Sequence, residues 1–464
     1  MAPGVSASPD AELEPEWHAE GVTVGDVLTA LSDIRRKFAR KDAGDDEHPH
    51  SRNRVMTLVA LVDSEGDEKR ALRACTAIAV HHPSLAIVIR EQPHVGEHHM
   101  DAWIATDTHQ SSSGVAVQCE VITLHVGSAS GDHLAPLVDP LLLSGVPTYL
   151  WWLGTPPFET RAFLDSLKIA DALVVDSAHF ERPLHSFIGL AEVAATSHQH
   201  LGVADFQWQR LAPWREMIAQ FFEPKDRRSF MQGIAEVGID YVGVGRGNRI
   251  GPSLLVGWFA SAIGWKVQQA VGGTGGVAVV HYIAGDRHME VVFRPVAKPE
   301  LAPGEVSAVR ITGAAGGRTF QLSIQRDPER PHRLGAEGAV VEFRELHPTG
   351  DDDAGTEVAE RQAVRHREML LKNREMLHHT ATGDLPGDSG ARNPTVLARE
   401  RRLGDSALIL LTMIDIGGAE TLRHVQHVNA EDEPTLLLQL LSTGAHDAVY
   451  DRSLAAAADL MREL

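Results

Sequence analysis

Two loops in this 464-residue sequence carry the residue types that a small-molecule site needs. Gly154 and Thr155 follow one apolar stretch, and Asp176 and Ser177 follow another. Asp176 could accept hydrogen bonds from ligand hydroxyls, and Gly154 could let a ligand approach the backbone. Because ligands of open α/β sheets bind beyond the carboxyl ends of the strands, these loops predict a sugar-phosphate crevice. The alternative interpretation is that Asp176 caps the helix that follows it.

A glycine-rich loop from residue 243 to 251 is a second candidate for phosphate binding. It precedes a predicted helix, and Arg246 and Arg249 could hold a phosphate at the helix N-terminus. Its spacing matches no nucleotide-binding fingerprint, so a simple loop between elements is the favoured interpretation.

No catalytic signature occurs in the sequence. There is no Gly-x-Ser-x-Gly, no P-loop, no His-Glu-x-x-His, and no Gly-x-Gly-x-x-Gly after the first predicted strand. We therefore expect a protein that is not an enzyme.

Metal and cofactor sites are also not predicted. Histidines are paired in the sequence, but no pair has a carboxylate at metal-binding spacing, and a metal needs three or four converging ligands. The two cysteines, Cys75 and Cys119, are too few for a Cys₄ zinc site or a disulfide scaffold, and their positions predict small buried hydrophobic residues. The paired histidines are His81-His82, His98-His99 and His378-His379, with His424 and His427 three residues apart.

Tryptophan is concentrated in one part of the chain: six of the eight lie between residues 151 and 265. Tryptophan and arginine are enriched at binding hot spots. The sequence thus predicts a docking surface, with an aromatic-rich core as the alternative. The candidate docking residues are Trp151, Trp152, Pro157, Phe158, Trp214 and Arg215.

The overall charge limits the classes of partner. There are 43 Lys and Arg against 63 Asp and Glu, a formal net charge of −20. Such a chain repels phosphate backbones, so nucleic acid is not expected as a partner. No apolar run approaches the ~20 residues of a membrane helix, and the acidic N-terminus lacks the apolar segment of a signal peptide. We expect a cytoplasmic protein with no membrane partner.

The elements that would position these residues alternate between strand and helix over residues 51–265. After an acidic tail and an N-terminal helix (1–50), apolar strands alternate with helices, which is typical of a largely parallel sheet with helices on its faces. We predict a Rossmann-like layered α/β domain. Its strands are 55–62, 85–90, 102–106, 115–126, 146–153 and 172–175, and its helices are 67–80, 134–143, 160–169, 213–222 and 253–263.

From residue 266 the apolar period changes to two. The alternation predicts an antiparallel β subdomain over 266–346. A polar insertion, expected to be mobile, follows over 347–405, and 406–464 is predicted to be a C-terminal helical segment with helices at 435–441 and 447–464. The predicted strands are 267–271, 277–283, 290–293, 306–311, 319–325 and 339–343.

Several segments resemble one known family. They are Val146–Trp152, Ala170–Ser177, Trp208–Arg215, Gly257–Trp265 and Asp447–Tyr450. Together they are similar to the glucose-6-phosphate dehydrogenase assembly protein (OpcA) family of actinobacteria and cyanobacteria. The similarity covers about 20–345 and the last ~25 residues.

The resemblance implies a non-catalytic protein that binds glucose-6-phosphate dehydrogenase, promotes its assembly into an active oligomer and raises its activity. It would act as an allosteric activator that supports NADPH production in the oxidative pentose phosphate pathway. The redox control of cyanobacterial relatives is not carried over, because only two cysteines are present. The alternative function is a sugar-phosphate sensor or enzyme that uses the crevice near Gly154 and Asp176, and a weaker one is a general scaffold.

Overall fold

The computed structural model divides the chain into two compact units. Unit 1 comprises residues 1–209 and 432–451, and unit 2 comprises 210–431 and 452–464. The division falls within helix α7 (Phe206–Arg210) and helix α14 (Ala448–Glu463). The structure describes residues 14–42, 54–79, 81–92, 99–110, 116–127, 134–197, 201–243, 247–299, 301–326, 408–428, 432–444 and 446–464.

Unit 1 contains an eight-stranded sheet in the order β1-β4-β5-β3-β2-β6-β7-β8. From β5 to β8 all neighbours are parallel, whereas β4 and β1 are added antiparallel at one edge. Counted along the chain, the parallel strands run 3-2-1-4-5-6, the order of a dinucleotide-binding sheet, which confirms the Rossmann-like prediction. The strands are β1 (Trp17–Ala19), β2 (Met56–Val62), β3 (Ser84–Gln92), β4 (Met100–Gln110), β5 (Ala116–Gly127), β6 (Thr148–Trp152), β7 (Ala172–Val175) and β8 (Gly202–Asp205).

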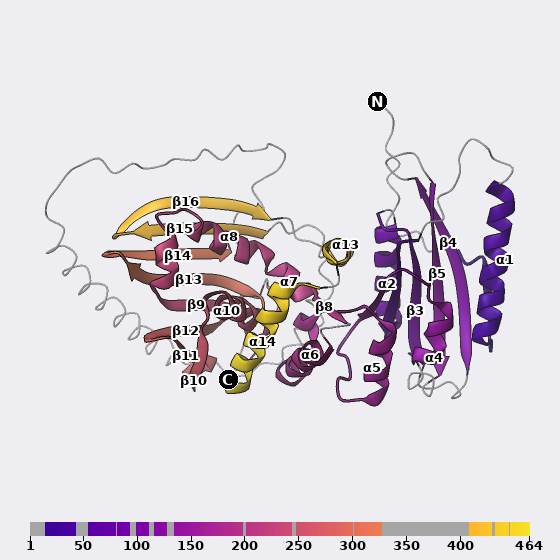
Figure 1. Cartoon of the computed structure of the whole chain (residues 1–464), viewed down its shortest axis with the longest axis horizontal. Helices are drawn as coiled ribbons and strands as arrows, with labels where there is room; N and C mark the ends of the chain where they lie inside the picture. Colours follow the sequence, from indigo (N-terminus) through magenta and orange to yellow (C-terminus); the bar gives the residue numbers. More distant parts are fainter. Residues whose placement is uncertain are drawn as a thin grey trace, which may run out of the picture. The chain divides into compact units, whose positions relative to one another are not determined.

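Helices cover both faces of this sheet because successive strand residues point to opposite sides. Val121 of β5 packs in one core cluster with α2 and α13, whereas its neighbour Glu120 is paired with Arg35 of α1. Figure 1 shows α1 and α2 on opposite sides of β3 and β5. The helices are α1 (Val24–Asp42), α2 (Glu65–Ala79), α4 (Leu134–Val138), α5 (Arg161–Ser166), α6 (Pro183–Ser197) and α13 (Glu433–Thr443), with 3₁₀ turns η1 (Asp139–Leu141), η2 (Leu167–Ile169) and η3 (Ser177–His179).

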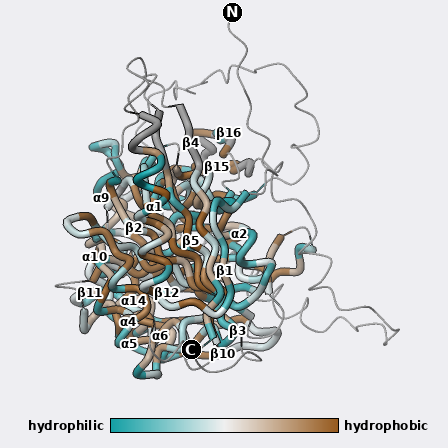
Figure 2. Tube along the Cα trace, turned by 90° about the vertical axis from the view of Figure 1, so that its right-hand side faces the viewer, coloured by the Kyte–Doolittle hydropathy of each residue, from teal (hydrophilic) through white to brown (hydrophobic). Residues whose placement is uncertain are grey.

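The core of unit 1 lies between the sheet and α2. Leu58, Ala60 and Val88 of the inner strands are fully buried, and Leu436, Leu437 and Leu440 of α13 join the same cluster. In Figure 2, strands β2 and β5 are mostly in hydrophobic colours, and hydrophilic residues lie on α1 and α2. The long parallel strands are therefore apolar on both faces, as an internal parallel sheet requires.

Unit 2 contains a second eight-stranded sheet, in the order β10-β11-β12-β9-β13-β14-β15-β16. All neighbours are antiparallel except β9 and β12, which are parallel. The sheet is therefore mixed, which corrects the prediction of a purely antiparallel one. The strands are β9 (Ile234–Val242), β10 (Lys266–Gly272), β11 (Ala278–Ala284), β12 (Arg287–Val296), β13 (Val306–Ala315), β14 (Arg318–Arg326), β15 (Leu408–Ile416) and β16 (Ala419–Val428).

One face of this second sheet is apolar. Val237, Ile239 and Tyr241 of β9 are fully buried on that face, whereas the alternating positions are polar. Helix α10 approaches α14 closely, since a Cβ at Gly257 would lie 2.2 Å from the carbonyl oxygen of Ser453. The helices are α8 (Ala212–Phe222), α9 (Arg228–Gln232), α10 (Ile250–Ile263) and most of α14, with the 3₁₀ turn η4 (Thr274–Gly276).

Several elements differ from the sequence predictions. Residues 408–428, which belong to the predicted C-terminal helical segment, form β15 and β16, joined by Gly417 and Gly418 at φ 69° and 86°. Paired glycines with positive φ favour a tight hairpin turn, and this signal outweighs the apolar run of β15. The predicted helix 134–143 ends at 138, where η1 with Pro140 begins. The predicted β subdomain begins at residue 266, whereas unit 2 begins at residue 210. Unit 2 therefore includes strand β9, which the sequence analysis does not predict. The predicted strand 339–343 and insertion 347–405 lie outside the described residues.

Candidate functional site

The order of the parallel strands reverses between β2 and β6, where a Rossmann-like sheet places its ligand crevice. Asp63 follows β2, and Gly154 lies just beyond β6. Gly154 adopts φ 122°, and a Cβ at this position would lie 3.4 Å from Oδ2 of Asp63. A carboxylate of the protein itself therefore stands against the glycine that was expected to admit a ligand.

Helix α2 starts at this switch point, and its N-terminus is occupied by its own side chains. The Oγ of Ser64 accepts a hydrogen bond from the Asp67 backbone N–H (3.1 Å) and donates one to Asp67 Oδ2 (2.6 Å). Glu65, Asp67 and Glu68 fill the first turn. A phosphate at a helix N-terminus needs backbone N–H donors and a positive field, and here acidic groups stand in the first turn.

The charge of the switch point is negative. Burial raises the pKa of Asp63 above its ordinary value, and the nearby carboxylates of Asp67 and Glu181 raise it further. A sugar phosphate or a nucleotide would add more negative charge beside these three groups. Asp67 is also paired with Arg70, and the carboxylates of Asp63 and Glu181 disfavour the anionic ligand predicted from Gly154 and Asp176.

The other predicted ligand-binding residues of this edge have structural partners. Thr155 Oγ1 accepts a hydrogen bond from the backbone N–H of Glu181 at 2.9 Å. Asp176 caps η3, accepting from Ala178 N–H at 3.3 Å, and its Oδ2 lies 2.9 Å from His179 Nδ1. This confirms the alternative interpretation of Asp176 as a helix cap.

Arg249 also has a structural role rather than the predicted phosphate-binding one. Its side chain is buried; Nε donates to the Tyr241 hydroxyl (3.0 Å) and an Nη atom to the Gly276 carbonyl (2.9 Å). These bonds tie the start of α10 to β9 and to the turn before β11. Arg246 lies outside the described residues.

Ser177 contributes to a buried network that the sequence analysis missed. Its backbone N–H and its hydroxyl donate to the two oxygens of Asp205, at 3.0 and 2.6 Å. Asp205 also accepts from the Gln207 N–H (2.9 Å) and the Tyr450 hydroxyl (3.2 Å). Burial raises the pKa of Asp205 to about 6, although the bonds from Ser177 and Gln207 lower it, and it raises that of Tyr450 well above its ordinary range.

A second polar cluster that sequence reasoning missed lies at the carboxyl ends of β3 and β5. Nε2 of His125 lies 3.0 Å from Glu68 Oε2, while Nδ1 accepts from Gln92 (3.1 Å) and Arg90 (3.3 Å). The His125 ring also packs 4.5 Å from that of Trp103. Both ring nitrogens are engaged, so His125 is held as a structural side chain. These residues are scattered along the sequence and form no motif.

Two of the predicted docking residues lie in the core. The side chains of Trp151 and Trp214 are each 1% exposed, and Trp151 packs edge-on against Phe206 with ring centroids 5.9 Å apart. Their predicted docking role is therefore wrong: both satisfy the alternative of an aromatic core, because each points inward from its element. Arg215 is half-buried on α8 of unit 2.

The remaining docking candidates form a partly exposed aromatic cluster in unit 1. Trp152 and Phe158 are half-buried, and both pack edge-on against Phe163 at 5.3 Å. Phe158 also packs against α6, because a Cβ added at Gly189 of that helix would lie 2.8 Å from the Cβ of Phe158. We call the following residues the aromatic rim: Trp152, Pro157 and Phe158, with Leu164 and Leu184, both 47% exposed, on the adjoining helices α5 and α6.

Metal-binding groups and membrane spans were also sought. Within the described ranges, no three His, Cys, Asp or Glu side chains converge closely enough to hold a metal ion. In the same part of the chain, no helix is both long enough and apolar enough to cross a bilayer.

Comparison with known proteins gives matches along most of the chain. Residues 75–192 match the profile described as the glucose-6-phosphate dehydrogenase subunit N-terminal domain, and residues 201–454 match that of the C-terminal domain. Three cyanobacterial relatives are named as candidate OxPP cycle proteins OpcA. The one from Synechococcus elongatus is 31% identical over 199 residues (42% of this chain, 43% of the relative), and that from Nostoc punctiforme is 30% identical over 208 residues (44% and 43%).

These aligned regions span less than half of the length of the curated relatives. Among solved structures, a dehydrogenase (MviM) from Clostridium difficile is similar over 88% of this chain and 97% of that one, at 7% identity and a TM-score of 0.36. That score is too low to bear on fold or function.

Proposed function

This chain belongs to the family of glucose-6-phosphate dehydrogenase subunits that includes the OpcA proteins, and we propose that it binds glucose-6-phosphate dehydrogenase and stabilises the active oligomer of that enzyme. The chain itself is non-catalytic in this proposal. It supports NADPH formation in the oxidative pentose phosphate pathway by activating the enzyme, in the cytoplasm where the pathway operates.

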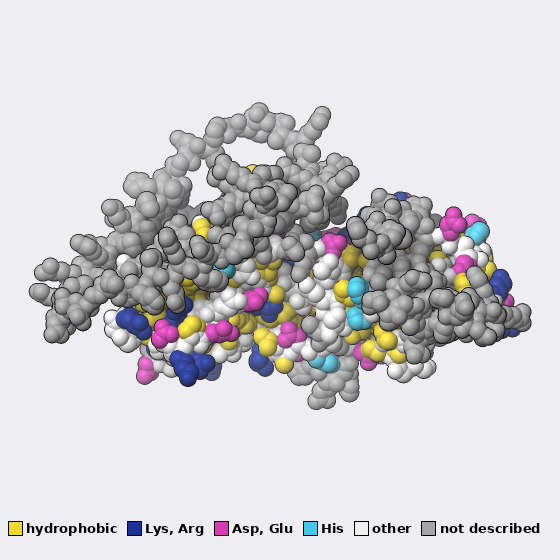
Figure 3. Space-filling model, turned by 90° about the horizontal axis from the view of Figure 1, so that it is seen from above, with side chains coloured by type: hydrophobic (Ala, Val, Ile, Leu, Met, Phe, Trp, Pro, Cys, Tyr) yellow, Lys and Arg dark blue, Asp and Glu magenta, His cyan; other side chains and the backbone are white. Residues whose placement is uncertain are grey.

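The observation that carries the proposal is the aromatic rim of unit 1. Leu164 and Leu184 are each 47% exposed on α5 and α6, and residues of the same two helices, Phe163 and Gly189, pack against the half-buried aromatic rings of the rim. Exposed apolar side chains around aromatic anchors are typical of binding hot spots. The rim is bordered by polar residues, since His185 Nε2 lies 3.0 Å from Glu159 Oε1. Figure 3 shows another trait of the surface: hydrophobic and charged side chains of both signs are interspersed where the face is described.

The mechanism we propose is thermodynamic linkage. A protein that binds only the active assembly of an enzyme shifts the assembly equilibrium toward it by mass action. The coupling is reciprocal, so substrate that favours the active assembly also tightens the complex. No group of this chain has to reach the reacting atoms.

The test mixes the chain with glucose-6-phosphate dehydrogenase of the same organism, and records NADPH formation and complex mass by light scattering in the same samples. The wild type gives a heavier assembly and a higher rate. Leu164→Asp combined with Leu184→Asp weakens the complex about tenfold or more, because each places a charge in a desolvated interface. Leu28→Asp is the matched control, since Leu28 is exposed on α1 away from the rim.

Two results would overturn the proposal. If the wild type neither binds nor activates the enzyme, this chain has another function. If the double variant activates like the wild type, the enzyme binds elsewhere. The alternative of a sugar-phosphate sensor is disfavoured by the carboxylates of Asp63 and Glu181, and we expect no thermal shift with glucose 6-phosphate, 6-phosphogluconate or NADP in the absence of the enzyme.

A further inference from the structure

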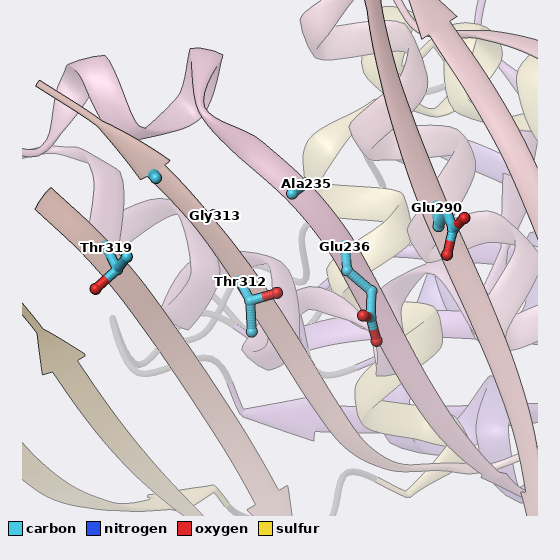
Figure 4. A pocket seen from close by; sticks show the side chains of 7 residues that line it. Ala235, Glu236, Glu290, Thr312, Gly313 and Thr319 are labelled. Atoms are coloured by element: carbon cyan, nitrogen blue, oxygen red, sulfur yellow. The ribbon is translucent and has the colours of Figure 1, made fainter. Parts of the chain in front are cut away.

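A cavity of about 300 Å³ opens on the polar face of the unit 2 sheet, outside all the residues discussed so far. Four neighbouring strands line it: Glu290 on β12, Glu236 on β9, Thr312 on β13 and Thr319 on β14. Figure 4 shows the Glu236 and Glu290 side chains on adjacent strands, with Thr312 on the other side of Glu236. Ala235, Gly313 and Ala314 supply its apolar part.

A β-bulge and two closely packed glycines lie beside the cavity. The pairing of β13 with β9 shifts register between Thr312 and Gly313. A Cβ at Gly313 would lie 2.1 Å from the Gly233 carbonyl oxygen, and one at Gly233 would lie 2.1 Å from that of Ala314. The two backbones are therefore in direct contact, and neither glycine can be replaced by a residue with a side chain without a shift. Bulges of this kind often accompany sites, because they re-aim neighbouring side chains.

The cavity carries one more negative charge than its neighbours neutralise. Glu236 and Glu290 are register partners on parallel strands, so two like charges stand side by side, which is unfavourable. Arg294 is shared between Glu236 (3.4 Å) and Asp240 (3.6 Å), and Arg310 pairs with Asp240 (2.8 Å). Glu290 faces only His281 Nδ1, at 3.5 Å, among the salt bridges described for it.

Arg294 lies between two carboxylates on this face, those of Glu236 and Asp240. A Cβ at Gly238 would lie 2.9 Å from an Nη atom of Arg294, so the guanidinium lies close to that glycine. Of the two glutamates at the cavity, only Glu236 is paired with an arginine among the described salt bridges, and that arginine is divided between Glu236 and Asp240.

We propose that this cavity receives an arginine side chain of the partner enzyme. The planar guanidinium has donors for both carboxylates at once, and arginine is enriched at binding hot spots. Its methylene groups pack on Ala235 and Ala314, and the hydroxyls of Thr312 and Thr319 can accept the remaining N–H groups. The identity of the donor rests on the proposed function, whereas binding of a guanidinium does not.

The first experiment needs no enzyme. Acetyl-arginine amide is titrated into the full-length ¹⁵N-labelled chain, with acetyl-citrulline amide as the uncharged probe of the same shape. The amides of Glu236, Glu290 and Gly313 shift with arginine but not with citrulline. Glu290→Gln and Glu236→Gln remove the response, and the control Glu223→Gln, at the exposed C-terminus of α8, keeps it. Equal shifts with both probes, or none, overturn the proposal.

The second experiment measures the affinity for glucose-6-phosphate dehydrogenase at several salt concentrations. Glu236→Gln combined with Glu290→Gln weakens binding about tenfold and flattens its salt dependence, because an ion pair is lost. If the wild type binds and this variant binds equally, the enzyme does not supply the arginine and the proposal fails. If the wild type does not bind the enzyme, the proposed function fails, and the arginine titration alone decides whether the cavity binds a guanidinium.

Discussion

The indole N–H of Trp208 donates a hydrogen bond to Oδ2 of Asp447 at 2.9 Å, across 239 residues of sequence. The other oxygen of Asp447 accepts the backbone N–H groups of Val449 (2.8 Å) and Tyr450 (3.1 Å) and so caps α14. The Tyr450 ring lies 5.5 Å from that of Trp208, and its hydroxyl reaches Asp205. Two sequence segments that support the family resemblance therefore meet in one buried contact of unit 1.

We predict that Trp208→Phe loosens the start of α14. The variant keeps a ring against Tyr450 but leaves Asp447 without its indole donor, at a cost of about 1–3 kcal/mol for a hydrogen bond to a charged group. Hydrogen–deuterium exchange of residues 447–451 should accelerate, while exchange in β3 stays unchanged. Unchanged exchange at 447–451 would mean that the cap alone holds the helix start.

Asp205 should make the free energy of unfolding fall as the pH rises, whereas most carboxyl groups make it rise. Burial raises the pKa of Asp205 from 3.8 to about 6. Between these values the folded state binds a proton that the unfolded state lacks, so the stabilisation is complete below pH ~4 and is lost as the pH rises through about 6. A shift of about two units corresponds to ~3 kcal/mol.

Asp205→Asn tests this prediction because the amide keeps the shape and stays neutral. The free energy of unfolding of the wild type should fall by ~3 kcal/mol more between pH 4 and pH 7 than that of the variant. Tyr450 and Ser177 can turn their hydroxyls to accept from the new amide. Unfolding free energies measured by urea at both pH values decide the point, and parallel pH profiles of the two proteins would contradict it.

Neither cysteine should react in the folded protein. Burial and the neighbouring Cys119 raise the pKa of Cys75 to about 12, so the reactive thiolate is scarce at neutral pH. Cys119 is also buried, and its thiol donates to the Ala79 carbonyl at 3.6 Å. We expect no rapid reaction with a disulfide reagent such as DTNB in buffer, and reaction of two thiols in denaturant. Rapid modification of either thiol in buffer would show that α2 opens readily from β5.

The sequence predicted the parallel sheet well because its strands are apolar on both faces and are separated by helices. The observed strand β7 has the predicted bounds, and α8 starts one residue earlier than expected. Strand β9 was missed although its apolar odd residues alternate with the charged Glu236 and Asp240, a pattern typical of a half-buried strand. Both charged residues pair with arginines on β12 and β13. Those partners lie more than fifty residues away.

The candidate site was harder to predict than the fold. The residue types of Asp176 and Arg249 suggested ligand binding. In the structure, Asp176 caps η3 and Arg249 donates a hydrogen bond to the Tyr241 hydroxyl, so both have structural roles. Tryptophan content suggested a surface, but exposure depends on which way each strand residue points, so Trp152 is half-buried and its neighbour Trp151 fully buried. Sequence alone does not tell which of two adjacent tryptophans faces the core when both faces of the sheet are covered.

Glu120 should be essential to the position of α1 on the sheet. Its carboxylate is 1% exposed and binds Arg35 through two hydrogen bonds, at 2.8 and 2.6 Å, and it also pairs with Arg54. Removing a buried charge partner costs about 3–5 kcal/mol because the remaining charges are left uncompensated. Glu120→Ala should lower the thermal midpoint and make α1 sensitive to protease.

The matched control is Asp33→Ala, which breaks an ion pair with Arg36 on the exposed side of the same helix and should change little. A triple variant, Glu120→Leu with Arg35→Leu and Arg54→Leu, should recover most of the lost stability, since an apolar set replaces the charges. If Glu120→Ala behaves like the control, water reaches the two arginines, and α1 is held instead by the buried side chains of Val27, Leu31 and Ile34.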